Sequence, residues 1–174
     1  MTTNRSLGIV DGLAQLSFAV IGLLEARARH ADLSLVQMRM LGVLRDRRPT
    51  INELATLLQL DKSSTSGLVD RASRRDLVRR VPADHDRRAV RVELTGSGRE
   101  LATNVADGFG NDVIALLRPL TAADRRALSA LVDGVLVAAA ETRGIDLFAA
   151  HQDNALKDDA LKDDALRDDA RDRA

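Results

Sequence analysis

The fold is decided by one stretch of the chain, residues 50–94, which reads TINELATLLQLDKSSTSGLVDRASRRDLVRRVPADHDRRAVRVEL. Thr50 and Glu53 have the spacing of a capping box, in which each side chain bonds the backbone N–H of the other residue and opens a helix. Asp61 is suited to cap a second helix that ends near Arg75. Because only Gln59-Leu60-Asp61 separates the two short helices, the stretch predicts a helix-turn-helix.

The second half of this stretch changes period. Leu77–Val81 and Ala89–Leu94 are rich in β-branched residues and roughly alternate, which is typical of strands. The polar segment between them, Pro82–Arg88, contains a helix and strand breaker. A β-hairpin with a charged tip is therefore expected beside the helix-turn-helix. The fold class that follows is mainly α with a small β-hairpin wing, a winged helix-turn-helix.

Long helices are predicted on both sides of this unit. Apolar residues recur at three- and four-residue steps from Leu7 to Arg29, and their stripe is wide enough to cover a second surface, most simply that of a dimer partner. Ser34 and Gln37 form a capping box that opens a helix to about Asp46, with Met38, Leu41 and Leu44 inward. After the hairpin, a Ser97–Glu100 box opens a helix to about Leu117. Thr121 starts the last helix, and Gly144 is its expected stop.

The chain therefore divides into a domain and a tail. Residues 1–150 form the domain, with dimerisation helices at about 6–30 and 97–143 and the winged helix-turn-helix at about 34–95. Residues 151–174 are a low-complexity charged tail in which leucine recurs every five residues. Five residues turn a helix by about 500°, so these leucines never form a stripe. A mostly disordered, solubilising extension is expected.

Composition narrows the function classes. The 174 residues include no cysteine, which excludes disulfides and thiolate metal sites, and the three histidines lack metal-ligand spacing. We expect no enzyme activity, no cofactor and no metal. Residues 45–91 carry twelve basic and seven acidic side chains, which favours a polyanion as partner. The chain has no uninterrupted apolar run of about 18 residues and no visible export signal, so we expect a cytoplasmic protein without a membrane partner.

The second helix of the pair begins with Asp61-Lys-Ser-Ser-Thr-Ser66. Serine and threonine are poor interior helix formers, and a cap requires only one hydroxyl. At a helix N-terminus, several hydroxyls beside free N–H groups can instead contact phosphates or base edges. This cluster indicates contact with nucleic acid.

A series of motifs then follows in order along the chain: Leu54-Ala55, Leu60-Asp61-Lys62-Ser63-Ser64, Leu68-Val69-Asp70-Arg71, Leu77-Val78-Arg79-Arg80, Asp86-Arg87-Arg88, Val92-Glu93-Leu94-Thr95 and Gly98. In this order and spacing the motifs resemble the multiple antibiotic resistance regulator (MarR) family, from about residue 7 to residue 145. The resemblance implies a dimer formed by the terminal helices, with a recognition helix in the major groove and a wing in the minor groove. Many members are repressors that are relieved by small aromatic or lipophilic ligands.

The resemblance also implies site residues. On the recognition helix, the expected DNA contacts are Lys62, Ser63, Ser64, Thr65 and Ser66, together with Arg71, which would reach a phosphate or order the wing. In the wing, Asp86 would orient Arg88 toward the minor groove and Arg87 would contact phosphate. An effector pocket would lie near His30, Met38, Leu41 and Phe109.

The chain departs from the family pattern at three positions. Gly67 stands where members often carry a larger, sometimes basic, residue, so a groove contact is expected to be lost. Asp76 replaces a glycine and can adopt a left-handed conformation, while Ala72 replaces a frequent leucine.

The function predicted from the sequence is a homodimeric, sequence-specific transcription regulator. It would be a ligand-responsive repressor that binds double-stranded DNA at a pseudo-palindromic operator. The alternative is a winged-helix protein-interaction module with weak or no specific DNA binding, whose acidic tail occupies the basic face.

Overall fold

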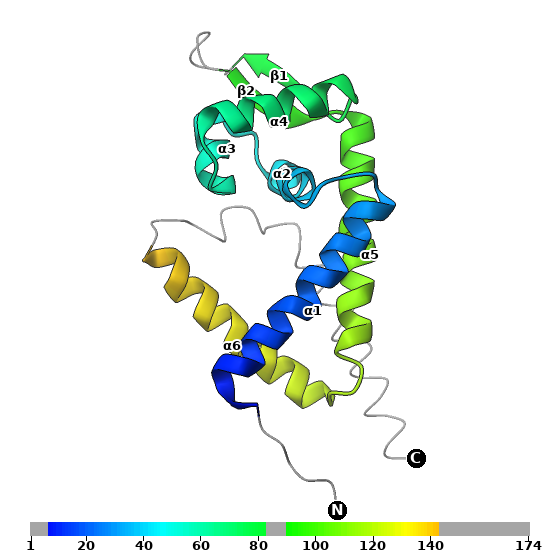
Figure 1. The fold of residues 1–174 in the computed structure, drawn as a ribbon, viewed down its shortest axis with the longest axis vertical. Coiled ribbons are helices and arrows are strands. Elements are labelled where there is room, and N and C mark those ends of the chain that lie inside the picture. The colour runs from blue at the N-terminus through cyan, green and yellow to red at the C-terminus, as the bar shows by residue number, and fades with distance from the viewer. Residues whose placement is uncertain (1–6, 83–89, 143–174) are drawn as a thin grey trace, which may run out of the picture. The chain divides into compact units, whose positions relative to one another are not determined.

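The structure, a computed structural model, describes residues 7–82 and 90–142, and the chain divides between Leu116 and Leu117 into two compact units (Figure 1). The first unit contains α1 (Gly8–His30), α2 (Leu35–Asp46), α3 (Ile51–Leu58), α4 (Lys62–Arg74), β1 (Val78–Pro82), β2 (Val90–Leu94) and α5 (Gly96–Leu116). The second contains α6 (Ala122–Glu141). Its start agrees with the sequence, because the Thr121 hydroxyl accepts a hydrogen bond from the Asp124 N–H at 3.2 Å.

Two capping boxes open helices where the sequence predicts them. At α2, the Gln37 N–H donates to Ser34 Oγ at 3.2 Å and the Ser34 N–H donates to Gln37 Oε1 at 2.8 Å. At α3, Thr50 and Glu53 exchange the same pair of bonds, at 3.3 and 2.7 Å. The bond from the Thr50 N–H lowers the pKa of the Glu53 carboxyl. Each box satisfies backbone donors that a helix start would otherwise leave open.

The turn between α3 and α4 is the one expected for a helix-turn-helix. Gln59 closes α3 in the left-handed conformation, with φ of 57°, and the Leu60 N–H donates to the Ala55 carbonyl at 2.9 Å. Asp61 then caps α4. Asp76, after α4, also adopts a left-handed φ of 54°, which confirms that this aspartate substitutes for a glycine there.

The hairpin pairs antiparallel from Val78 opposite Leu94 to Pro82 opposite Val90. The linker before α3 also pairs with β2, which the sequence does not predict. Thr50 forms an antiparallel bridge with Arg91, and the Val92 N–H donates to the Pro49 carbonyl at 2.9 Å. The wing is therefore attached to the α2–α3 linker as well as to α4.

The predicted cap of α5 is wrong. The Ser97 hydroxyl donates to the Asp76 carbonyl at 2.7 Å, and Thr95 Oγ1 instead accepts the Gly98 N–H at 3.0 Å. The chain approaches itself closely here, because a Cβ at Gly98 would lie 1.8 Å from the Leu77 carbonyl oxygen. Glycine at 98 is thus required for α5 to begin against the start of the hairpin.

The core lies among α2, α3, α4 and the hairpin, with the inner ends of α1 and α5. Its fully buried side chains include Met40, Leu41, Leu44, Leu54, Val69 and Val92. The prediction that Met38 points inward is only half right, because Met38 is partly exposed and Met40 is the buried methionine of α2.

α1 leaves most of its apolar side chains exposed. The exposed large ones are Ile9, Val10, Leu13, Leu16, Phe18 and Ile21, and Leu7, directly before the helix, is exposed as well. By length and composition alone α1 could also cross a membrane, a test that core helices of soluble proteins and signal sequences pass as well. Asp11 interrupts the apolar run of α1 and is the only charged residue from Gly8 to Leu24, so the helix does not appear in the sequence as one unbroken apolar segment.

Several predicted features lie outside the described residues. They are the hairpin tip, residues 83–89, with Asp86, Arg87 and Arg88; the stop at Gly144; and the tail, residues 151–174.

Candidate nucleic-acid interface

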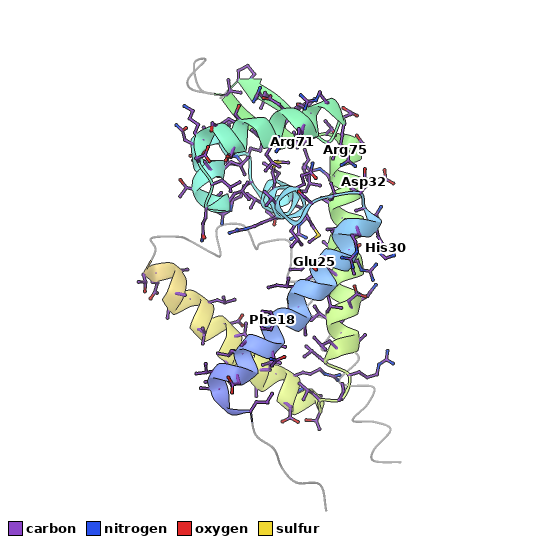
Figure 2. All side chains as sticks on the ribbon, in the orientation of Figure 1. Phe18, Glu25, His30, Asp32, Arg71 and Arg75 are labelled. Atoms are coloured by element: carbon purple, nitrogen blue, oxygen red, sulfur yellow. The ribbon has the colours of Figure 1, made fainter. Side chains whose placement is uncertain are left out.

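α4 has one buried face and one exposed, polar face. Thr65, Leu68, Val69 and Ala72 are buried against the core. The exposed side chains of the helix include Lys62, Ser63, Ser64, Arg71 and Arg74, and Figure 2 shows Arg71 on this helix. The small Ala72 therefore keeps its place in the core, and α4 presents basic and hydroxyl groups to solvent along its length.

The N-terminus of α4 is organised by Asp61. Its carboxylate accepts bonds from the Ser63 hydroxyl at 2.6 Å, the Ser64 hydroxyl at 2.7 Å and the Ser64 N–H at 2.7 Å. These bonds, the two hydroxyls first, lower the pKa of Asp61 well below its usual range. Both hydroxyl hydrogens are thereby committed, while their oxygens remain able to accept a bond from a base amino group.

Thr65 does not belong to the exposed surface, and the prediction of a DNA contact there is wrong. Its side chain is fully buried, and its hydroxyl donates to the Asp61 carbonyl at 2.9 Å. The hydroxyl is satisfied inside the helix because position 65 shares the inner stripe with Leu68 and Val69.

The wing strand β1 reaches back to α4 through Arg80. Its guanidinium donates to the Ser66 hydroxyl at 3.1 Å and pairs with the Asp70 carboxylate at 2.8 Å. Ser66 is partly exposed, so a nucleic acid would meet it together with Arg80. The sequence carries no signal for this contact, because Ser66 and Arg80 lie 14 positions apart in the chain.

A second feature that the sequence analysis misses lies at the base of the wing. The Glu93 carboxylate, only 8% exposed, pairs with Arg79 of β1 and with Arg48 of the α2–α3 linker at 3.3 Å. Both arginine side chains remain about two-thirds exposed. A buried carboxylate is tolerated when it is paired, and here it fixes two cations on the surface. A glutamate inside a short apolar strand was the available signal.

A cavity of about 370 Å³ lies among α1, α2 and α5. It is lined by Leu24, Leu33, Leu35, Met38, Arg39, Leu41, Gly42, Arg45, Ala102, Val105, Ala106 and Phe109. Three of the four predicted pocket residues, Met38, Leu41 and Phe109, come together in this lining. His30 does not: its ring is exposed, and Nδ1 lies 2.7 Å from the Ala26 carbonyl oxygen. The prediction is wrong for His30 because the end of α1 turns its ring back onto its own helix.

The two arginines that line the cavity, Arg39 and Arg45, form hydrogen bonds within the protein. The Arg39 guanidinium donates to the Leu57 and Leu58 carbonyls at 3.2 and 3.3 Å, and Arg45 bonds the Asp46 carboxylate at 3.2 and 3.3 Å. The remaining lining is apolar apart from the backbone. This arrangement suits a small apolar ligand.

Two arginines join the elements around the cavity: one links α1 to α5, and the other links the end of α4 to the turn after α1. Arg27 of α1 donates to both carboxylate oxygens of Asp112 in α5, at 2.5 and 2.6 Å, and this bond lowers the pKa of Asp112. Arg75, at the end of α4, donates to the Asp32 carbonyl at 2.6 Å; Asp32 lies in the turn after α1 (Figure 2). Because Leu33 follows Asp32 and lines the cavity, the end of α4 is attached directly to the cavity wall.

No group of three or more histidine, aspartate or glutamate side chains in residues 7–82 and 90–142 is arranged to hold a metal ion. Helices α2, α3 and α4, the turn at Gln59 and the hairpin packed on α4 define a winged helix-turn-helix protein.

Comparison with known proteins agrees with this class. A family model described as MarR family matches residues 31–89. The HTH-type transcriptional repressor NicR of Pseudomonas putida is 37% identical over 78 residues, which are 44% of this chain and 49% of that protein. The matched region thus spans about half of NicR.

Two solved structures share the fold over more of the chain. Wild-type MarR from E. coli in its apo form is 25% identical, with a TM-score of 0.64, covering 76% of this chain and 99% of that one. NadR in complex with 4-hydroxyphenylacetate is 21% identical, with a TM-score of 0.60, covering 78% and 96%. Residues 31–89 are thus similar to the MarR family, and the wider chain has the winged helix-turn-helix fold of the MarR structure.

Proposed function

We propose that this protein is a homodimeric transcriptional repressor that acts in the cytoplasm and binds a specific duplex DNA sequence. In this proposal α4 enters the major groove and the hairpin lies in the minor groove. The observation that carries the proposal is the exposed face of α4, where Lys62, Ser63, Ser64 and Arg71 are presented outward on a helix whose other face is locked into the core. The match to the repressor NicR supports it.

The exposed apolar side chains of α1 support the homodimer. A contiguous apolar surface of this kind on a soluble protein marks a site of association. A symmetric dimer would bring two copies of α4 to successive major grooves, about one helical turn apart, and so favour a pseudo-palindromic operator.

The test is fluorescence anisotropy with the full chain, a duplex from its own upstream region and a scrambled duplex, over a salt series. We expect tighter binding to the upstream duplex and a steep loss of affinity with salt, because phosphate contacts release counterions. Weak binding that is equal on the two duplexes would overturn specific recognition. It would favour the protein-interaction module, and deletion of residues 155–174 would then show whether the acidic tail occupies the basic face.

The wing contribution is tested at Arg88. Arg88→Ala is expected to weaken binding to the upstream duplex about tenfold, the effect of losing one good contact. Arg118→Ala is the matched control, because this exposed arginine follows α5 and lies far along the chain from the wing. Undiminished affinity of the Arg88 variant would remove the wing from the proposed mechanism.

We also propose that a small lipophilic or aromatic effector occupies the cavity and releases DNA. The apolar lining supports this, and so does the 4-hydroxyphenylacetate held by the structurally similar NadR. The effector would act through Leu33, Asp32 and Arg75, which join the cavity wall to the end of α4.

Small uncharged aromatic compounds serve as the first probes for the effector, with 4-hydroxyphenylacetate, which NadR binds, tested beside them. Coupling is reciprocal, so a ligand that weakens DNA binding must itself bind less well to the DNA complex. Gly42→Phe is the test variant: Gly42 lines the cavity, and a Cβ there meets nothing within 4 Å, so the ring can fill the space. The variant should bind DNA normally and lose its response to the probe. A retained response would place the effector elsewhere.

A further inference from the structure

Gly67 lies near the middle of α4, is partly exposed, and comes four residues, about one helical turn, before Arg71. A Cβ built at Gly67 would lie 3.5 Å from Arg71 Nη1. The guanidinium of Arg71 is therefore laid back along the helix, against the backbone of residue 67. Helical side chains lean toward the N-terminus in this way, and a glycine four residues earlier leaves them room to do so.

Arg71, like Arg74, differs from the arginines that come after residue 74. Arg75 is bonded to Asp32, Arg79 to Glu93 and Arg80 to Asp70. In the part of the chain that the structure describes, no carboxylate or carbonyl is paired with Arg71. The nearest carboxylate in sequence, Asp70, is already held by Arg80 at 2.8 Å. The donors of the Arg71 guanidinium thus remain available to an external acceptor.

The position of this guanidinium favours a base over a phosphate. Phosphates flank a helix in the major groove and are met by its ends and edges, whereas the middle of its outer face is directed at the base edges. The fork of an arginine matches the O6 and N7 acceptors of guanine.

We propose that Arg71, seated over Gly67, reads a guanine in the major groove and is the main specificity-determining residue of α4. This inference rests on the proposed function, because it requires a specific duplex. The Arg71 guanidinium occupies the space that a side chain at position 67 would fill, so Gly67 and Arg71 act as a pair.

The experiment measures anisotropy on the upstream duplex, on the scrambled duplex and on a set in which each base pair of the upstream site is replaced in turn. Arg71→Lys keeps the charge and removes the fork. We expect it to weaken binding to the upstream duplex about tenfold to a hundredfold while changing affinity for the scrambled duplex by less than about twofold. One G·C pair, whose replacement weakens the wild type by a similar factor, should have no effect on the variant.

Two further variants sharpen the result. Gly67→Leu keeps Arg71 but fills its seat, so preference for the same G·C pair should fall. Arg74→Ala is the matched control, since it removes an exposed arginine one step further along α4 and should lower affinity for both duplexes equally.

Equal loss on both duplexes in Arg71→Lys and Arg71→Ala, or wild-type discrimination in Arg71→Lys, would overturn the inference and leave the proposed function standing. A wild type that does not discriminate between the upstream and scrambled duplexes would overturn both.

Discussion

Leu54 in α3 and Leu13 in α1 are both leucines on helices of one compact unit, but one is buried and the other is exposed. Leu54 is 0% exposed, while Leu13 is 60% exposed. The difference extends to their neighbours: Leu58, Leu68 and Val69 are buried with Leu54, whereas Ile9, Val10 and Phe18 share the exposure of Leu13.

The lobe of α2, α3, α4 and the hairpin has a buried core, to which the inner ends of α1 and α5 contribute, and it carries charged side chains on its surface. The first half of α1 exposes an apolar surface, and its contact with water is unfavourable in free energy. We therefore expect substitutions in the lobe to act on protomer stability and substitutions on α1 to act on association.

The largest effect is expected at Gly98, where the lobe meets α5. In Gly98→Ala the new Cβ would fall 1.8 Å from the Leu77 carbonyl oxygen, so the backbone must move. The free energy of unfolding should drop by about 4 kcal/mol or more, as measured by urea denaturation. Gly96→Ala is the control, because a Cβ at 96 meets nothing within 4 Å. Equal stability of the two variants would show that the contact is not present in solution.

The next largest effect is expected when leucine is replaced by alanine at a buried and at an exposed position. Leu54→Ala removes a fully buried side chain and should lower the free energy of unfolding by about 2–5 kcal/mol at every protein concentration. Leu13→Ala should change the stability of the dilute, dissociated protomer by less than about 0.5 kcal/mol. Similar losses in dilute solution would mean that Leu13 is covered within its own chain.

The elements of the fold were predictable because their signals are local. Ser34 with Gln37, and Thr50 with Glu53, are partners three residues apart, and Asp61 caps the helix that it precedes. Asp76 could be assigned a left-handed conformation from its residue type alone. Ser97 was misassigned because Thr95, two residues earlier, takes the cap position by accepting the Gly98 N–H, while the Ser97 hydroxyl donates to the Asp76 carbonyl.

The site was less predictable, because orientation and distant pairing decide it. Thr65 looks like its serine neighbours in the sequence, and only the position of the inner stripe of α4 sends it into the core. The pairing of Glu93 with Arg48 joins residues 45 positions apart and depends on the linker packing against β2. The space over Gly67 reads as a lost contact until the direction of the Arg71 side chain is known.

A smaller effect is expected for Leu13→Glu, which places a charge on the exposed apolar surface of α1. Burial of a leucine side chain is worth about 1.5–3 kcal/mol, and a symmetric dimer contains two copies. The dissociation constant should rise at least about a hundredfold in sedimentation equilibrium, with the helical content unchanged. Gln15→Glu adds the same charge at an exposed polar position of α1 and should have little effect. A wild type that sediments as a monomer would contradict the dimer.

The smallest effect concerns the pH dependence of the lobe, through the cap of α4. Bonds from Ser63 and Ser64 lower the pKa of Asp61 in the folded state. The stabilisation by its carboxylate is therefore complete above the unfolded pKa of about 3.9 and is lost as the pH falls from there through the lower folded value. Asp61→Asn keeps a good N-cap and has no proton to bind. Near pH 7 the two proteins should differ little, and between pH 5 and 2 the free energy of unfolding should fall more steeply for the wild type. Parallel curves would show that the carboxylate at the start of α4 contributes no more to the lobe than a neutral cap does.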